Sequence, residues 1–245
     1  MSDKTKPDDS SGSSPSAPGW LSLARIAARG IVSLVKPPPA PILINRENTD
    51  LPRFISSDTL REVRVPRGQH QTNRWPVLHI GSTPKVDLTT WNLRILGAVE
   101  EPKSWNWKEF RSFPASVVAA DMHCVTRWSR LDNSWEGVRV AELMKQVRIR
   151  PEARFVLIHA EQGYTTNLPI DDFLGDDCLF AWSHDGHPLT PDHGWPLRLV
   201  VPRLYAWKSA KWVRGVEFLA EDRPGFWEEN GYHNHGDPWL EERFW

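Results

Sequence analysis

The chain has 245 residues, with 30 basic and 31 acidic side chains and a formal net charge of −1 at pH 7. This balance gives no general electrostatic attraction to nucleic acid. Two cysteines are too few for a disulfide framework. No apolar run approaches the about 18 residues that a membrane span requires. Since the N-terminus also lacks the pattern of a cleavable signal, we expect a cytoplasmic globular protein that binds no nucleic acid.

The first 49 residues differ in composition from the remainder. Residues 1–19 are rich in Ser, Pro, Asp and Lys, which predicts a disordered tail. Apolar residues recur at helical spacing over residues 20–35, with arginines elsewhere on the helical wheel. This amphipathic segment either docks on its own domain or makes peripheral contact with a membrane or a partner. A Pro-rich spacer follows over residues 36–41. We therefore predict that a single domain occupies residues 50–245.

The pattern beyond residue 50 is a mixture of strand and helix signals. Apolar and polar residues alternate over residues 91–95, which predicts a half-buried strand. The apolar spacing over residues 140–147 predicts a short amphipathic helix. Compact apolar runs predict further strands over residues 154–159, 197–201 and 212–218. The tail after Glu221 is polar and aromatic, and we expect it to wrap over the domain. With no repeated βαβ rhythm and no Gly-rich phosphate loop, an α+β fold of mixed sheets with short helices is favoured.

Positive charge is concentrated in one segment near the C-terminus. It holds five basic residues and no acidic residue: Arg198, Arg203, Lys208, Lys211 and Arg214. Ser209 lies between the two lysines and adds a directed hydrogen-bond donor, a combination that suits a phosphate group. The alternative is the ordinary solvated face of a strand. Lys208 has no clear partner, and we expect it to contribute less than Lys211.

Cys124 is the candidate metal ligand. A thiolate prefers thiophilic metals, and one cysteine suffices when a cofactor supplies the remaining ligands. The alternative is a buried structural cysteine, which is the better interpretation of Cys178 in its apolar run. Closely spaced histidines occur twice, but without Cys-x-x-Cys or His-Glu-x-x-His the zinc signal is weak.

Four ordered segments resemble the molybdopterin-binding domain of the sulfite oxidase family, in the small bacterial and archaeal branch related to the periplasmic methionine-sulfoxide reductases. These segments span residues 73–79, 121–129, 163–169 and 193–212. The resemblance implies the α+β fold of that domain, with mixed sheets and short helices. It also implies a mononuclear molybdenum oxidoreductase that moves an oxygen atom or electrons to or from a small sulfite- or sulfoxide-like substrate.

The resemblance also implies roles for particular residues. Cys124 would ligate molybdenum, with the dithiolene of molybdopterin supplying further sulfur ligands. The implied contacts to the cofactor are Asn73, Arg74, either Thr165 or Thr166, His193, Arg198, Ser209, Ala210 and Lys211. Among these, His193 and Arg198 would hold the pterin and its phosphate, and residues 209–211 match a phosphate-binding Ser-x-Lys. Because no haem or flavin motif is present, a separate electron donor or acceptor protein is expected.

Two features of the sequence leave the function open. The paired arginines that bind sulfite in eukaryotic sulfite oxidases are not matched position for position by Arg127 and Arg130, so the substrate is unassigned. The 14 tryptophans also allow a non-catalytic, Trp-rich module that binds carbohydrate or protein, with Cys124 as a structural residue. Metal content would discriminate between the two functions.

Overall fold

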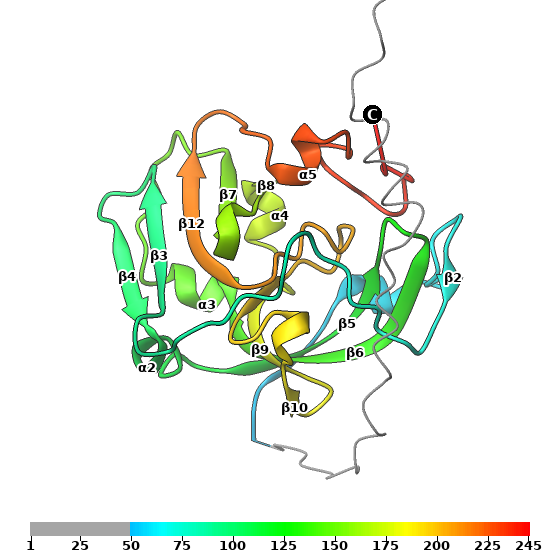
Figure 1. Cartoon of the computed structure of the whole chain (residues 1–245), viewed down its shortest axis with the longest axis horizontal. Coiled ribbons are helices and arrows are strands. Elements are labelled where there is room, and N and C mark those ends of the chain that lie inside the picture. Colours follow the sequence, from blue (N-terminus) through cyan, green and yellow to red (C-terminus); the bar gives the residue numbers. More distant parts are fainter. Residues whose placement is uncertain (1–49) are drawn as a thin grey trace, which may run out of the picture. The chain divides into compact units, whose positions relative to one another are not determined.

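The computed structural model describes residues 50–245, so the predictions for residues 1–49 lie outside the described residues. Two β-sheets form the framework of this part of the chain (Figure 1). The α-helices within residues 50–245 have only four or five residues each. Within residues 50–245, no helix combines the length and the apolar character needed to cross a membrane.

The first sheet has seven strands and carries the turn that contains Cys124. Its strands are β1 (Arg53–Ile55), β2 (His70–Gln71), β5 (Ser116–His123), β6 (Trp128–Arg139), β9 (Leu179–His184), β10 (His187–Pro188) and β11 (Arg198–Val200). The main path runs β1-β5-β6-β9-β10, while β2 pairs with β6 and β11 pairs with β9. β5 and β6 are antiparallel neighbours, and residues 124–127 connect them.

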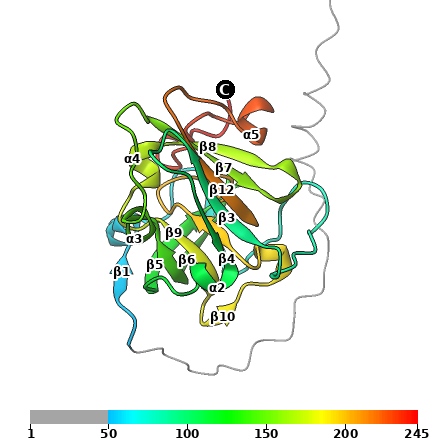
Figure 2. The ribbon, with the colours of Figure 1, turned by 90° about the vertical axis from the view of Figure 1, so that its left-hand side faces the viewer.

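The second sheet has five strands in the order β4-β3-β12-β7-β8. They are β3 (Asn92–Gly97), β4 (Lys103–Asn106), β7 (Phe155–Ala160), β8 (Thr165–Pro169) and β12 (Val213–Leu219). The central strand β12 runs parallel to β3 and antiparallel to β7. Figure 2 shows β7, β8 and β12 grouped apart from β5, β6 and β9.

Short helices connect or flank these strands. They are η1 (Ser57–Leu60), α2 (Trp107–Phe110), α3 (Val140–Met144), η2 (Glu161–Gly163), α4 (Ile170–Phe173), η3 (Pro191–His193) and α5 (Phe226–Glu229). α2 begins at a capping box, in which Asn106 accepts from the backbone N–H of Glu109 and the Glu109 side chain accepts in return. α3 buries Val140, Leu143 and Met144, as the apolar spacing predicts.

The apolar core joins the two sheets. One cluster of buried residues takes Leu93 and Ile95 from β3, Phe180 from β9 and Phe218 from β12. A second cluster surrounds Cys124 and is rich in aromatic rings, among them Trp128, Trp135, Tyr205, Trp207 and Tyr232. Among residues 50–245, every tryptophan except Trp245 is buried or half-buried. The tryptophans therefore serve packing, and they do not form the exposed aromatic platform that a binding module would present.

The strands predicted over residues 91–95, 154–159, 197–201 and 212–218 and the helix over residues 140–147 are present, with bounds shifted by a few residues. The tail after Glu221 is ordered and packs back on the domain, as expected. Its Gly236 carbonyl accepts a hydrogen bond of 2.8 Å from the backbone N–H of Tyr205. Cys124 and Cys178 are both free thiols.

Candidate functional site

Cys124 lies in a tight turn between β5 and β6. Its backbone N–H donates to the Trp128 carbonyl over 2.9 Å, and its carbonyl accepts from the Arg127 N–H over 3.0 Å. The side-chain amide of Gln69 donates to the same carbonyl over 3.1 Å. Arg127 has a φ of 72°, the left-handed conformation that closes the turn. These bonds fix the backbone of Cys124, whose residue surface is only 7% exposed.

The two buried cysteines have opposite hydrogen-bond roles. Cys124 Sγ accepts a hydrogen bond of 3.1 Å from the Thr126 hydroxyl. Burial raises the pKa of this thiol, but the Thr126 hydrogen bonds and the charges of Arg243 and Lys211 oppose that rise. Cys178 instead donates to the Asp172 carbonyl over 3.0 Å. Burial and nearby carboxylates hold its pKa well above the ordinary value. Only Cys124 therefore has a hydrogen-bond donor and positive charges that would stabilise a metal-binding thiolate against the effect of burial.

Arg198 is a buried cation at the start of β11, and its residue surface is only 4% exposed. Its guanidinium donates to the carbonyls of His193 and Ser209, each over 3.1 Å. The buried Nε has no hydrogen-bond partner. Burial lowers the pKa of Arg198 to about 9. A buried guanidinium with an unused donor can bind an anionic ligand.

Lys211 is a second cation close to Arg198. Its Nζ donates to the main-chain carbonyl of Asp192 over 2.7 Å. Burial, and then the charge of Arg198, lower the pKa of Lys211 to about 7. Within residues 50–245, neither cation forms an ion pair with a carboxylate. The buried Arg198 and the half-buried Lys211, neither of them paired with a carboxylate, fit a phosphate group, which is one of the two interpretations that the charge pattern left open.

His193 and Gly194 bring this region together. The ring of His193 stacks on Trp75 with centroids 3.8 Å apart, and its Nε2 lies 3.2 Å from the Trp75 carbonyl oxygen. Gly194 has a φ of 110° and ends η3. A Cβ at this glycine would lie 3.1 Å from Arg198 Cβ and 3.2 Å from Lys211 Cβ. The glycine therefore permits the close approach of the two segments that carry the cations.

The other predicted cofactor contacts lie in different surroundings. Asn73 and Arg74 are exposed and immediately precede Trp75, next to His193. The Ser209 hydroxyl accepts from the backbone N–H of Val201 over 2.9 Å and keeps its own proton for donation. The Ala210 carbonyl accepts from the backbone N–H of Leu199 over 2.8 Å. Residues 209–210 are thus held against β11 and its continuation.

The two threonine candidates differ in burial. Thr165 is half-buried at the start of β8. Thr166 is fully buried, and its hydroxyl donates to Glu228 Oε1 over 2.9 Å. This bond engages the Thr166 hydroxyl in a structural network. Thr165 is therefore the more accessible of the two residues. The contact of either residue with the cofactor stays a prediction.

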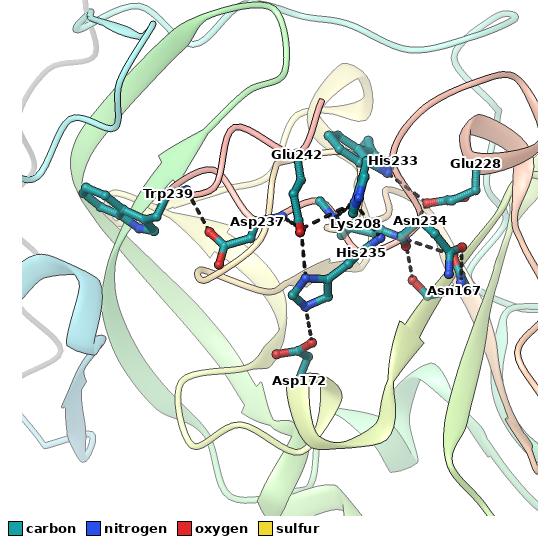
Figure 3. A network of polar contacts seen from close by, with 12 residues as sticks. Asn167, Asp172, Lys208, Glu228, His233, Asn234, His235, Asp237, Trp239 and Glu242 are labelled. Atoms are coloured by element: carbon teal, nitrogen blue, oxygen red, sulfur yellow. Dashed lines mark hydrogen bonds and ion pairs between the residues drawn. The ribbon is translucent and has the colours of Figure 1, made fainter. Parts of the chain in front are cut away.

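The expectation that Lys208 lacks a clear partner is wrong. Lys208 is fully buried, and its Nζ forms an ion pair of 2.6 Å with Glu228. The same nitrogen donates to the Asn167 carbonyl and Oδ1, each over 2.9 Å, and to the Asn234 carbonyl over 2.6 Å (Figure 3). Trp207 Nε1 also donates to Glu228 over 2.9 Å. Lys208 thus joins β8, α5 and the tail immediately beside the predicted phosphate-binding residues.

Tyr232 is a candidate site residue to which the sequence reasoning assigned no role. It is buried, and its ring stacks on Trp227 with centroids 4.7 Å apart. Burial, and then the negative charge of Cys124, raise the pKa of Tyr232 to about 12. The tail thus places a phenol in the same buried cluster as Cys124. The only sequence signal was its place in the aromatic tail.

Within residues 50–245, no three His, Cys, Asp or Glu side chains are grouped so as to hold a metal ion. The zinc alternative therefore has no support in the described residues. A single thiol beside an anion-binding region is instead the donor set that suits a metal whose other ligands come from an anionic cofactor.

Comparison with known proteins supports the same chemistry. An uncharacterized oxidoreductase, YuiH, of Bacillus subtilis is 52% identical over 182 residues, which cover 74% of this chain and 92% of that protein. Sulfite oxidase of Arabidopsis thaliana is 26% identical over 188 residues, covering 62% of this chain and 48% of the plant enzyme. The solved structure of the sulfane dehydrogenase SoxCD from Paracoccus pantotrophus matches with a TM-score of 0.54 and 20% identity. It covers 61% of this chain and 42% of the SoxCD chain, and it supports the fold alone.

A family model described as the oxidoreductase molybdopterin binding domain matches residues 80–227, more than half of the chain. This match confirms the predicted family, enzyme class and cofactor, and the SoxCD likeness confirms the α+β fold of mixed sheets with short helices. The family match also rules against the alternative of a non-catalytic Trp-rich module. The chain belongs to the family of oxidoreductases with a molybdopterin-binding domain.

Proposed function

We propose that this protein is a mononuclear molybdenum oxidoreductase that moves an oxygen atom or electrons to or from a small sulfite- or sulfoxide-like substrate. One observation carries the proposal: the guanidinium of the buried Arg198 lies 5.3 Å from the ring centroids of Trp75 and Trp135, and both rings belong to or pack against the cluster that contains Cys124. The proposed metal ligand and the proposed phosphate site would thereby lie in one region. When bound, molybdenum with its pterin supplies the redox chemistry, and the protein binds and orients the reactants.

The residues of the chain divide this work among them. Cys124 would donate thiolate electron density to the metal, which favours its oxidised form. Arg198 and Lys211 would neutralise the cofactor phosphate, with Ser209 as a neutral donor. The neutral ring of His193, whose pKa burial lowers to about 4, would offer a flat surface against the pterin together with Trp75.

The charge near Cys124 supports an anionic substrate. Cys124 is only 7% exposed, so it would serve as a covered ligand of the metal at which the substrate reacts. The exposed Arg127 follows Cys124 by three residues and supplies positive charge at the same turn. This charge favours anionic molecules.

We also propose a separate electron-transfer protein as the partner and the cytoplasm as the location. The sequence carries no haem or flavin motif, so the electrons would pass to or from another protein. The two free thiols suit a reducing compartment. Residues 20–35 would provide any peripheral membrane contact. Fractionation of cells that express the full chain or a chain without residues 20–35 tests the location, since a membrane role requires the deletion to release the protein.

Elemental analysis and an absorption spectrum test the proposed function. Protein from a molybdenum-competent host should contain a stoichiometric amount of molybdenum and show a thiolate-to-metal absorption. Cys124→Ser should remain folded but lose that absorption and the redox activity, whereas Cys178→Ser should keep both. A wild-type protein that purifies without molybdenum, or a fully active Cys124→Ser, would contradict the proposal.

A further inference from the structure

Thr126, to which the sequence analysis assigned no role, contacts the sulfur atom that the proposed function places on molybdenum. Its hydroxyl donates to Cys124 Sγ over 3.1 Å. Thr126 lies inside the turn that the Arg127 N–H closes on the Cys124 carbonyl, between β5 and β6. Since this backbone is fixed on both sides, the turn itself holds the hydroxyl against the sulfur.

Thr126 does not need this hydrogen bond to satisfy its hydroxyl group. The residue is exposed, so water could satisfy the hydroxyl if the bond to sulfur were absent. The direction of the bond is also informative. Cys124 Sγ accepts, whereas the structural thiol of Cys178 donates to a carbonyl. A directed donor on a nearly covered sulfur is an arrangement that changes the properties of the sulfur more than the stability of the fold.

We propose that Thr126 sets the redox potential of the metal by tuning the electron donation of Cys124, an inference that rests on the proposed function. A hydrogen bond to a ligating thiolate withdraws electron density from the sulfur, and such bonds tune the potential of thiolate-bound metals. Weaker donation favours the reduced metal. Thr126 acts through Cys124, so it is a positioning residue and not a catalytic one.

Four variants of the full-length protein isolate the hydroxyl. Thr126→Val keeps the shape of the side chain but removes the donor, and Thr126→Ala is a second hydroxyl-free variant of smaller size. Thr126→Ser retains the donor. Thr89→Val is the matched control, because Thr89 is exposed and its hydroxyl donates over 2.8 Å to Asp87.

The measurement is a potentiometric titration with dithionite, followed by the electron paramagnetic resonance of the one-electron-reduced metal and by the thiolate-to-metal absorption. Thr126→Val and Thr126→Ala should lower the midpoint potential by up to ~59 mV. That shift corresponds to about a ten-fold change in the one-electron equilibrium constant. Their absorption should move to longer wavelength, since the sulfur becomes a better donor. Thr126→Ser and Thr89→Val should match the wild type.

Two outcomes would separate this inference from the proposed function. If both hydroxyl-free variants hold molybdenum and keep the wild-type potential and absorption, Thr126 does not tune the metal, while the proposed function stands. If the wild type holds no molybdenum, or shows no thiolate-to-metal absorption, the proposed function fails and the inference fails with it.

Discussion

Replacing Lys208 by methionine should strongly destabilise the protein. The side chain is fully buried, and its Nζ connects Glu228, Asn167 and Asn234. Methionine fills a similar volume but leaves the Glu228 carboxylate, in a residue that is 1% exposed, without its cation. Removing one partner of a buried ion pair costs about 3–5 kcal/mol. For a domain of this size, that loss corresponds to a decrease in Tm of about 6–20 °C.

The chain offers a matched control on its surface. Lys145 and Glu142 have the same N–O distance of 2.6 Å, but the Lys145 side chain is 66% exposed. Water screens that pair, so Lys145→Met should change the free energy of unfolding by less than about 1 kcal/mol. The comparison therefore separates burial from contact distance.

Urea unfolding followed by tryptophan fluorescence, with calorimetry for Tm, measures both variants. The double variant Lys208→Met/Glu228→Gln should recover part of the loss, because no unpaired buried charge remains. If Lys208→Met unfolded with a loss no greater than that of Lys145→Met, the network in Figure 3 would not stabilise the fold as argued.

Three further predictions concern the cofactor. Lys211→Ala should purify with substoichiometric pterin, since a lost charged hydrogen bond costs about 1.5–3 kcal/mol. The control Lys145→Ala should stay fully loaded. Equal pterin content in the two variants would contradict the phosphate site. Because the Lys211 pKa is about 7 in the cofactor-free protein, its ammonium group is lost above that pH. Cofactor affinity should therefore fall as pH rises, and Lys211→Arg should flatten the dependence of that affinity on pH. A pH-independent affinity in the wild type would refute this. A chain beginning at Thr49 should retain full molybdenum content, and an empty or insoluble product would show that the preceding residues belong to the core.

The sequence predicted the features that are encoded locally. Cys124 and the segment from Arg198 to Lys211 were found because a lone thiol and a basic run without acids are visible in one stretch of chain. The strands and α3 followed from apolar periodicity. These signals require no knowledge of what lies opposite in space.

The environment of Lys208 could not be predicted in the same way. Its partners Asn167, Glu228 and Asn234 come from separate segments, and only the folded chain brings them together. A run of basic residues in the sequence does not show which of its lysines are solvated and which are buried. The choice between Thr165 and Thr166 was left open for the same reason, because burial of Thr166 depends on the distant α5.

The most direct test of the central claim is the number of sulfur ligands around molybdenum, measured by X-ray absorption on the wild type and Cys124→Ser. If Cys124 binds the metal and the cofactor binds independently at Arg198 and Lys211, the variant should retain molybdenum with one sulfur ligand fewer than the wild type. An unchanged sulfur count in a fully loaded Cys124→Ser protein would contradict the account, because the thiol would then not be a ligand.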